Sequence, residues 1–418
     1  MKDLRTLILA AGKGTRMKSH LSKVLHPVCG RPLIQYVFDV AKSVGSLKTC
    51  IVLGHQNEQV REALGPGIQI AIQKKLLGTA DAVRCAQAAF RGYKGHVLVL
   101  CGDTPLLRKP TIRELIRKHK KSGAACTFLT AVVHDSSGYG RVIRGEKGAV
   151  LAIREETDAT DYEKNIAEIN VGVYCFKSEL LFAAIREVAL NRNKREFYLT
   201  DVVSIFADKS LKIETVETEE AEEGLGVNSR EDLAFAEGVL RKRILSDLML
   251  QGVTIVDPQT TYIHADVKIG RDTVIHPCTF IEENVKIGAH CSIGPFARLR
   301  PGTRIADHAE VGNFVEISRT QFGSASRAKH FSFLGDSVIG KSVNIGAGVV
   351  TANYDGVEKN KTYIADQAFI GSDSVLIAPV KVGRRAVTGA GCVVTKGKTV
   401  PDGGVIVGVP GKILSKKK

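Results

Sequence analysis

The chain has 418 residues, more than one ordinary hydrophobic core holds, so two domains are expected. Its 44% hydrophobic and 25% charged residues are the composition of an ordinary soluble globular protein. No apolar run is long enough to span a bilayer, and no signal-peptide pattern follows Met1. Nine cysteines without C-x-x-C spacing argue against a disulfide framework and a zinc site, so a reducing, cytoplasmic location is expected.

The net charge of +15 is compatible with a nucleic-acid partner. However, the positive residues are dispersed, apart from Lys416–Lys418, and the chain has few aromatic residues and no tryptophan. Small anionic substrates account for this charge as well as RNA does. We therefore expect small anionic substrates and no nucleic acid.

A glycine-rich basic loop follows the first apolar run. Thr6–Ala10 has the pattern of a buried parallel strand, and it leads directly into Gly12-Lys13-Gly14-Thr15-Arg16. Glycines let a backbone approach a phosphate closely, and cations neutralise it. Met17 occupies a glycine position of both the dinucleotide and the Walker fingerprints, so neither applies. A basic turn without a ligand is the alternative, but a third cation, Lys23, favours an anion site.

Short apolar runs alternate with amphipathic runs as far as about residue 131. The expected strands after the first are Thr49–Leu53, Ile68–Ile72, His96–Leu100 and Ala125–Ala131, and the expected helices are Pro32–Val44, Ala80–Ala89 and Thr111–Lys120. This alternation predicts a mainly parallel sheet covered by helices on both faces, with ligands at the carboxyl ends of the strands.

Two further polar clusters follow expected strands. Gln73, with Gly78 and Thr79, offers donors and acceptors that suit the edge of a pyrimidine base, although a surface Gln before a helix cap is the commoner case. Asp103 follows the run His96–Leu100, where a carboxylate beside a phosphate loop is suited to Mg²⁺. Helix capping is the alternative role of Asp103.

Mixed polar and aromatic clusters continue along the chain. Carboxylates, amides and tyrosines in one cleft suit a sugar ring, whose hydroxyls each donate and accept. The clusters are Gly138–Arg141, Glu155, Glu168–Asn170 and Glu196–Asp201. Gly226-Val227-Asn228 then precedes Ser229, a good N-cap for a helix over Glu231–Leu250, which we interpret as the connector between domains.

The order of these motifs resembles the sugar-1-phosphate nucleotidyltransferases. The loop, Lys23, "QKKLLGTADA", "CGDTPL", "GYGR", "EINVG" and "GVNSR" carry the resemblance. It is closest to the bifunctional N-acetylglucosamine-1-phosphate uridyltransferase/glucosamine-1-phosphate N-acetyltransferase family, and it covers essentially the whole chain. The resemblance implies transfer of a uridylyl group from UTP to N-acetylglucosamine-1-phosphate, with Mg²⁺.

The resemblance also assigns roles to residues of the first half. Lys23 and Arg16 would bind the phosphates and act in catalysis, and Asp103 and Asn228 would hold Mg²⁺. Gln73, Gly78 and Thr79 would read uracil. The remaining expected nucleotide and sugar contacts are Leu9, Ala10, Ala11, Gly12, Cys101, Gly102, Gly140, Glu155 and Asn170.

A six-residue period replaces the helix and strand pattern beyond Gly252. Aliphatic residues recur every six positions from Ile263 to Ile317, the register resumes at Phe333, Ile339 and Ile345, and it continues after the loop Asn353–Thr362. Three such hexads close one triangular coil of a parallel β-helix. The expected fold is thus an α/β nucleotide-binding domain (1–228), a linker helix (229–252) and a left-handed parallel β-helix of hexapeptide repeats (253–418).

Function in a solenoid comes from residues that break its pattern. The hexads resemble acyltransferases of this architecture, which are typically trimers with active sites between subunits. By that resemblance His330 would be the general base for transfer from acetyl-CoA to glucosamine-1-phosphate, and Arg300 and Asn344 would contact the sugar phosphate. The expected acetyl-CoA contacts are Ala347, Asn353, Tyr354, Ser372 and Ala390.

The solenoid departs from the family at three of its binding positions. Ser318 aligns with a sugar-binding Lys, Phe333 with a Tyr, and Gly408 with an Arg. Arg319, Lys412 or Lys416–Lys418 are candidates to compensate. The alternatives to a bifunctional enzyme are therefore a uridyltransferase whose solenoid is a trimerising scaffold or acetylates another amine, and a basic regulatory protein that pairs the same two folds.

Overall fold

The computed structural model describes residues 3–54 and 57–414 and contains two compact units, one ending at Gly238 and one beginning at Val239. The change from one unit to the other falls inside α8 (Arg230–Leu250), the helix expected as a connector. Its start is capped as expected, because Ser229 Oγ accepts the N–H of Asp232 at 3.1 Å. No helix in the described ranges is long and apolar enough to cross a membrane.

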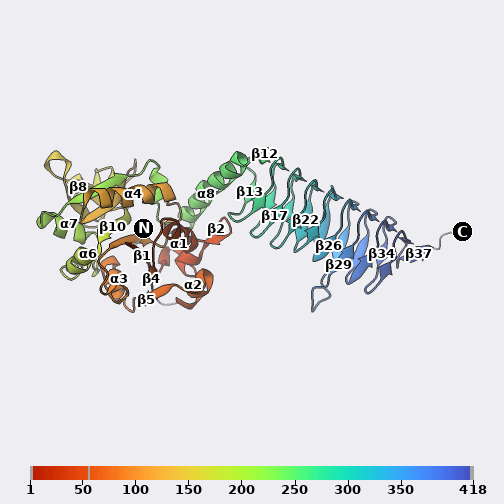
Figure 1. The fold of residues 1–418 in the computed structure, drawn as a ribbon, viewed down its shortest axis with the longest axis horizontal. Coiled ribbons are helices and arrows are strands. Elements are labelled where there is room, and N and C mark those ends of the chain that lie inside the picture. The colour runs from red at the N-terminus through yellow and green to blue at the C-terminus, as the bar shows by residue number, and fades with distance from the viewer. Residues whose placement is uncertain (1–2, 55–56, 415–418) are drawn as a thin grey trace. The chain divides into compact units, whose positions relative to one another are not determined.

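The first unit is built on one mixed sheet with the strand order β11-β7-β10-β6-β1-β4-β5 (Figure 1). Strands β1, β4, β5 and β6 are parallel neighbours, while β10 is antiparallel to β6 and β7 and also pairs with β8 of the β8–β9 hairpin. The strands are β1 (Leu4–Ala10), β4 (Thr49–Leu53), β5 (Gln69–Ile72), β6 (His96–Cys101), β7 (Cys126–Val132), β8 (Arg141–Arg144), β9 (Val150–Arg154), β10 (Glu168–Lys177) and β11 (Ile213–Glu217). A separate two-stranded hairpin joins β2 (Pro27–Val28) and β3 (Arg31–Pro32).

Helices cover both faces of this sheet, as the alternation predicted. Leu4 and Ile8 of β1 pack in one core with α1 and α4, and Leu7 packs in the other with α3, α6 and α7. The helices are α1 (Leu33–Ser43), α2 (Asn57–Leu64), α3 (Thr79–Cys85), α4 (Lys109–Ser122), α5 (Asp161–Lys164), α6 (Ser178–Ala184) and α7 (Asp201–Asp208), with short 3₁₀ turns η1 (Thr15–Met17), η2 (Lys23–Leu25), η3 (Gln87–Phe90), η4 (Glu146–Gly148) and η5 (Ala221–Gly224). The sequence analysis did not include α2, and the helix expected over Ala80–Ala89 is divided into α3 and η3.

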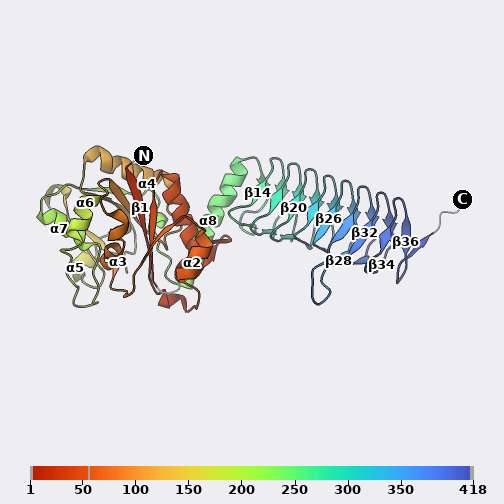
Figure 2. The same ribbon diagram turned by 60° about the horizontal axis from the view of Figure 1, so that its bottom comes forward.

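The second unit is a parallel β-helix whose short strands stack into three sheets (Figure 2). The first sheet contains β12 (Thr254–Ile255), β15 (Val274–Ile275), β18 (Ser292–Ile293), β21 (Glu310–Val311), β24 (Arg327–Ala328), β27 (Asn344–Ile345), β30 (Phe369–Ile370), β33 (Val387–Thr388), β36 (Val405–Val407) and the antiparallel β37 (Lys412–Leu414). The second contains β13 (Tyr262–Ile263), β16 (Phe280–Ile281), β19 (Arg298–Leu299), β22 (Val315–Ser318), β25 (Ser332–Gly335), β28 (Val350–Ala352), β31 (Val375–Ile377) and β34 (Val393–Val394). The third contains β14 (Lys268–Ile269), β17 (Lys286–Ile287), β20 (Arg304–Ile305), β23 (Gln321–Phe322), β26 (Ser337–Ile339), β29 (Thr362–Ile364), β32 (Val380–Val382) and β35 (Thr399–Val400). The expected fold class is confirmed.

The inward register is confirmed at nearly every expected position but is wrong at Phe333. Leu334 is fully buried and pairs with Ile317 of the preceding coil, whereas Phe333 is half-buried and lies beside Glu316 on the outer surface. The physical reason is two shortened hexads, because Phe322 follows Ile317 by five positions and Ile339 follows Leu334 by five, so the position six before Ile339 is not the inward one. A strict six-residue count across this stretch therefore misses the core position by one.

One loop leaves the coils between β28 and β29 (Figure 2). Tyr354 and Lys359 form an isolated antiparallel bridge in it. Asp355 accepts the backbone N–H groups of Val357 and Glu358 at 3.1 and 2.8 Å. Lys396 of a later coil donates to Asp355 at 3.0 Å. These contacts fasten the loop at its tip.

The shifted register predicts different costs for two neighbouring truncations. Leu334→Ala opens a cavity in the solenoid core and should lower the free energy of unfolding by about 2–5 kcal/mol. Phe333→Ala removes a ring on the outer surface and should lower the free energy of unfolding clearly less than Leu334→Ala does. Urea unfolding of the two variants, followed by far-ultraviolet circular dichroism, checks the ranking, and an equal or reversed cost would contradict the register.

Candidate active sites

A cleft of about 530 Å³ lies at the carboxyl ends of the parallel strands of the first unit. A backbone hydrogen bond of 2.8 Å from Gly102 to Leu9 joins the loops after β6 and β1. Val227 donates to the carbonyl of Asp103 at 2.9 Å, which brings in the segment before α8. The expected residues that line the cleft are Leu9, Ala10, Ala11, Gly12, Lys23, Gln73, Gly78, Thr79, Cys101 and Asp103.

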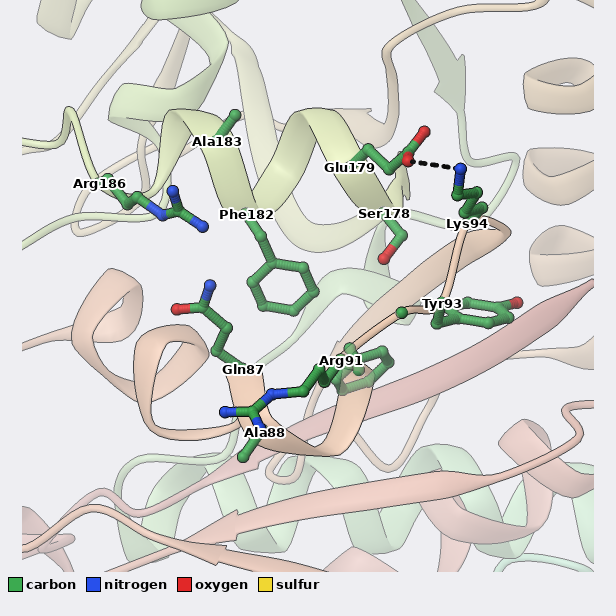
Figure 3. A pocket seen from close by; sticks show the side chains of 12 residues that line it. Gln87, Ala88, Arg91, Tyr93, Lys94, Ser178, Glu179, Phe182, Ala183 and Arg186 are labelled. Carbon is green, nitrogen blue, oxygen red and sulfur yellow. Dashed lines mark ion pairs between the residues drawn. The ribbon is translucent and has the colours of Figure 1, made fainter.

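A second cavity of about 580 Å³ lies between η3 and α6 (Figure 3). Arg91 and Lys94, which line it, precede β6, whereas Cys101 and Asp103 of the first cleft end or follow that strand. The two cavities therefore lie at opposite ends of one strand. None of the expected site residues lines the second cavity, so the first is the candidate nucleotide site.

Lys23 connects the glycine-rich basic loop with the expected metal ligands. Its ammonium forms an ion pair with the Asp103 carboxylate and donates to Asn228 Oδ1 at 3.0 Å. The side chains of Lys23 and Asp103 are only 10% and 20% exposed, so each charge depends on the other for compensation. The structure thus brings together Lys23, Asp103 and Asn228 from three distant segments.

Gly14 makes this arrangement possible. Its φ is +61°, in the left-handed region that glycine adopts most readily, and a Cβ added there would lie 2.6 Å from Lys23 Cβ. Any larger residue at this position would push the loop and Lys23 apart. The second glycine of the loop therefore serves close packing against the lysine as well as access to a phosphate.

The chemistry of the donor set fits Mg²⁺. Asp103 and Asn228 supply one carboxylate and one amide oxygen to a common cation, here the ammonium of Lys23. Among the described residues there is no cluster of three or more His, Cys, Asp or Glu side chains that could form a metal cage. Mg²⁺ commonly binds through one or two carboxylates together with substrate phosphates, so this sparse site suits it.

Gln73 is held for use as an acceptor. Its amide nitrogen donates to the carbonyl of Gly78 at 3.0 Å and to Asp81 at 2.9 Å, and the side chain is 3% exposed. Both donors are therefore occupied, and within residues 3–54 and 57–414 the side-chain oxygen forms no hydrogen bond. An oxygen fixed in this way can accept the ring N–H of a pyrimidine. Asp81 lies inside the "QKKLLGTADA" motif, but its orienting role was not expected from sequence.

The strand-end segment at Gly78 is packed against the chain near Phe197. Thr79 Oγ1 accepts the N–H of Leu199 at 2.9 Å, and Phe197 donates to Leu77 at 2.7 Å. Gly78 has φ +98°, and a Cβ there would lie 2.5 Å from the carbonyl oxygen of Phe197. Thr79 therefore contributes its hydroxyl to the fold while the residue lines the cleft.

The expected sugar contacts also come together. Asn170 donates its backbone N–H to Gly140 at 2.8 Å, and a Cβ at Gly140 would lie 3.7 Å from Glu155 Oε2. Asn170 Nδ2 donates to Tyr174 Oη at 2.7 Å, and Thr200 donates to Glu155 at 2.8 Å. The Glu155 carboxylate and the Asn170 amide are thus each fixed by a hydrogen bond to a neighbouring side chain, and such groups suit a sugar ring.

Two expected cleft residues have less direct roles. Arg16 lies in η1, is exposed, and does not line the cleft, whereas Lys13 of the same loop does. The expected part of Arg16 in catalysis stays a prediction.

Burial raises the pKa of the Cys101 thiol to about 12, and Asp103 acts in the same direction. Cys101 is therefore a neutral wall of the cleft at ordinary pH.

In the second unit, Arg300 and Phe333 lie on one face. Arg300 forms an ion pair of 2.9 Å with Glu316, and Glu316 is the direct neighbour of Phe333 in the second solenoid sheet. Asn344 belongs to β27 of the first sheet, where its neighbours are Arg327 and Phe369. Arg300 follows β19 of the second sheet and Asn344 lies in β27 of the first, so the two residues are on different faces of the solenoid.

Three of the five expected acetyl-CoA residues form a column at one corner of the coils. Backbone hydrogen bonds join Asp373 to Ala347 and Gly391 to Ser372, so Ala347, Ser372 and Ala390 stack on three successive coils. Their side chains are small and partly or fully exposed, so this corner is accessible to a ligand.

His330 lies one coil before that column. The strand pairs Ala328–Ile345 and Phe333–Val350 on either side have the same offset in sequence and place His330 opposite Ala347 of the next coil. The His330 side chain is exposed. Thus the structure places the expected base on the same edge as the small-residue column.

A polar cluster surrounds Ser318, one of the three positions that depart from the family. Ser318 is buried and its hydroxyl accepts Arg319 Nη1 at 2.8 Å. Arg319 Nε and Nη2 bind both oxygens of Asp336 at 2.7 and 2.8 Å, and Asn353 Nδ2 also donates to Asp336. This bidentate pair lowers the pKa of Asp336.

The third departure, Gly408, lies outside this cluster, as do Lys412, a candidate to compensate, and Tyr354, an expected acetyl-CoA contact. Gly408 and Lys412 are exposed near the end of the solenoid, and Tyr354 is 61% exposed in the inserted loop. Lys416–Lys418 lie outside the described residues.

Comparison with known proteins assigns the two units to two families. Residues 5–221 match the nucleotidyl transferase family, and residues 284–319 and 361–396 match the bacterial transferase hexapeptide family. The "Bifunctional protein GlmU" of Shouchella clausii is 45% identical and that of Pelobacter propionicus 44% identical, with 93% and 97% of this chain and 93% and 96% of those proteins covered. The "Bifunctional protein GlmU" of Bacillus subtilis is 42% identical, with 98% of this chain and 94% of that protein covered.

The chain belongs to the GlmU family. It combines the nucleotidyltransferase and hexapeptide-repeat transferase domains of these bifunctional proteins in one polypeptide. The resemblance seen in the sequence motifs is therefore confirmed, and the reading as a regulatory protein that merely pairs the two folds is not supported.

The electrostatics of this GlmU-family cleft predict that Glu155 lowers stability. Burial raises the pKa of the Glu155 carboxyl above its usual value, and Asp201, Asp158 and Glu196 act in the same direction against the Thr200 hydrogen bond. A raised folded-state pKa means that the free energy of unfolding falls as pH rises from the ordinary carboxyl pKa through the raised one. Glu155→Gln should therefore raise the melting temperature by a few degrees at pH 7.5 and change little near pH 4.

Glu156→Gln is the matched control of opposite sign. Glu156 pairs with the buried Arg141, which lowers the pKa of Glu156, so its ionised form stabilises the fold. That variant should melt lower at pH 7.5. Calorimetric scans at both pH values provide the measurement, and a lower melting temperature for Glu155→Gln at pH 7.5 would contradict the assignment.

Proposed function

We propose that the first unit transfers a uridylyl group from UTP to N-acetylglucosamine-1-phosphate, giving UDP-N-acetylglucosamine and pyrophosphate. The convergence of Lys23, Asp103 and Asn228 beside a glycine-rich loop carries the proposal. The fixed acceptor oxygen of Gln73 at the same cleft favours a pyrimidine base as the ligand. The polar side chains of Glu155 and Asn170 favour an acetamido sugar as the second substrate.

The chemistry requires alignment and charge neutralisation rather than a protein nucleophile. A phosphate oxygen of the sugar phosphate attacks the α-phosphorus of UTP in line, the bond to the bridging oxygen breaks, and pyrophosphate leaves. Lys23 offsets the charge that builds on the leaving group. Asp103 and Asn228 would hold Mg²⁺, which supplies further neutralisation of the triphosphate when bound.

We propose that the second unit transfers an acetyl group from acetyl-CoA to glucosamine-1-phosphate. His330 would take the proton from the amine as it attacks the thioester carbon, with the thiol of CoA leaving. Arg300 suits the sugar phosphate, and the corner formed by Ala347, Ser372 and Ala390 suits the extended CoA chain. The product of this reaction is the acceptor of the first unit.

The acetyl site calls for more than one copy of the chain. Arg300 and Asn344 lie on different sheets of the solenoid, so a pocket that uses both needs the face of a neighbouring copy. We therefore propose a homotrimer, in which three triangular solenoids cover one another's faces. All nine cysteines are free thiols, as expected for the proposed cytoplasmic location, and the proposed partners are the four small substrates.

A second candidate keeps the uridyltransferase and changes the solenoid. Ser318 and Phe333 lack the ammonium and hydroxyl that the family resemblance implies for the acceptor site, and Arg319 is already bound to Asp336. A hydrogen bond to a charged group contributes roughly 1.5–3 kcal/mol, or one to two decades in affinity. The solenoid would then be a trimerising scaffold or would acetylate a different amine.

A two-activity assay tests the proposal. Lys23→Ala should lower pyrophosphate release from UTP and N-acetylglucosamine-1-phosphate at least about hundredfold, because a charge that stabilises the leaving group is lost. His330→Ala should lower CoA thiol release with glucosamine-1-phosphate by about 10²–10⁴-fold. Each variant should retain the other activity, and loss of both activities in either variant would contradict two separate sites. Wild-type protein that releases pyrophosphate but no thiol would support the second candidate.

The departure at Phe333 gives a gain-of-function test. Phe333→Tyr restores one hydroxyl on the face that carries Arg300 and Glu316, and it should raise kcat/KM for glucosamine-1-phosphate about threefold to tenfold, as one neutral hydrogen bond does. Phe314→Tyr is the control, since Phe314 is also exposed but lies at a corner of the coils. An unchanged or lower kcat/KM for Phe333→Tyr would remove Phe333 from the acceptor site.

A further inference from the structure

The ammonium of Lys23 lies where the two proposed Mg²⁺ ligands converge. It contacts Asp103 Oδ2 and Asn228 Oδ1, and these are the oxygens that the metal would use. We infer that Lys23 occupies the metal position in the nucleotide-free protein and keeps Mg²⁺ out until a triphosphate draws the lysine away. This inference rests on the proposed uridylyl transfer and concerns the order in which its parts assemble.

The lysine and the metal exclude each other at this position. Mg²⁺ requires oxygen ligands at about 2.0–2.1 Å with nearly ideal octahedral geometry. Lys23 Nζ lies 3.0 Å from Asn228 Oδ1 and is paired with Asp103 at the same time, so no second cation fits between the nitrogen and these oxygens. Repulsion between the two cations in this largely buried place adds to the steric conflict.

Lys23 also removes the main driving force for binding a metal alone. A buried carboxylate without a counter-ion would attract any divalent cation strongly. Here Asp103 is already neutralised by Lys23. Mg²⁺ would have to break that ion pair before it gained its own contacts, so the protein without nucleotide should bind it weakly.

A bound triphosphate supplies the alternative partner for Lys23. The lysine lines the same cleft as the phosphate loop, with Gly12, Lys13 and Gly14 around it. Its four-carbon stem is flexible, so the ammonium can turn from Asp103 to a phosphate without movement of η2. Lys23 thereby leaves both oxygens to the metal at the moment when the nucleotide needs it.

Mn²⁺ binding to the nucleotide-free protein tests this inference without any turnover. Free Mn²⁺ is measured by electron paramagnetic resonance. Lys23→Met should bind Mn²⁺ at least about tenfold more tightly than the wild-type protein, because a competing charge at hydrogen-bond distance is gone. Lys23→Gln, which retains donors but no charge, should also bind more tightly and gives a second variant for the same measurement.

Two control variants locate the effect. Lys13→Met removes an exposed charge from the same loop and should change Mn²⁺ affinity less than about twofold, because an exposed charge is screened by salt. Lys23→Met combined with Asp103→Asn should lose the gained affinity. Lys23→Met should also show a higher melting temperature with Mn²⁺, as a bound ligand stabilises the folded state.

The outcomes separate this inference from the proposed function. Unchanged or weaker Mn²⁺ binding by both Lys23 variants, or an equal gain in Lys13→Met, would overturn the exclusion by Lys23. Absence of pyrophosphate release by wild-type protein with UTP and N-acetylglucosamine-1-phosphate would instead overturn the proposed reaction. If the Lys23 variants bind Mn²⁺ more tightly but the wild-type protein does not release pyrophosphate, Lys23 still keeps the metal out. Only the link between this exclusion and uridylyl transfer is then removed.

Discussion

One ion pair connects the parts of the nucleotide cleft. Lys23 and Asp103 are 80 residues apart, and Lys23 and Asn228 are 205 residues apart, yet a single ammonium contacts both. The pair is largely buried, so neither charge is stable there without the other. The parallel strands bring their carboxyl ends to one edge, Gly14 lets the loop approach Lys23, and the Val227–Asp103 hydrogen bond fastens the segment before α8.

The sequence predicted those features of the fold and of the cleft that follow from periodicity and strand ends. Alternating runs located the parallel sheet, and its strand ends located Gln73 and Asp103, because parallel strands end at one edge. The sequence did not identify the role of Asp81 in orienting Gln73. An Asp in the first turn of a helix carries no local signal that it accepts a hydrogen bond from a side chain eight residues earlier. Spacing in a loop also does not determine which cation lines the cleft, which is Lys13 rather than Arg16 in the structure, so the expected role of Arg16 stays a prediction.

In the solenoid, counting residues worked until the coil itself changed length. Each inward position is counted from its neighbours, so the five-residue step from Leu334 to Ile339 left Phe333, which lies six positions before Ile339, outside the core. That error had a useful consequence, because an outward Phe333 lies beside Glu316 and Arg300, where a substrate contact is possible. The sheet to which Asn344 belongs follows from counting hexads in threes, and the shortened hexads before it interrupt that count.

The order of the two proposed reactions makes the solenoid departures matter for the first unit as well. Acetylation of glucosamine-1-phosphate yields the sugar phosphate that we propose Glu155 and Asn170 hold. Those two residues are fixed by Thr200 and Tyr174 within the first unit, so they do not depend on Ser318 or Phe333. A weakened acetyl step would therefore leave the uridylyl site intact but dependent on an external supply of the N-acetylated sugar phosphate. The two active sites are coupled through their shared metabolite, while the groups that build each site remain local to its own unit.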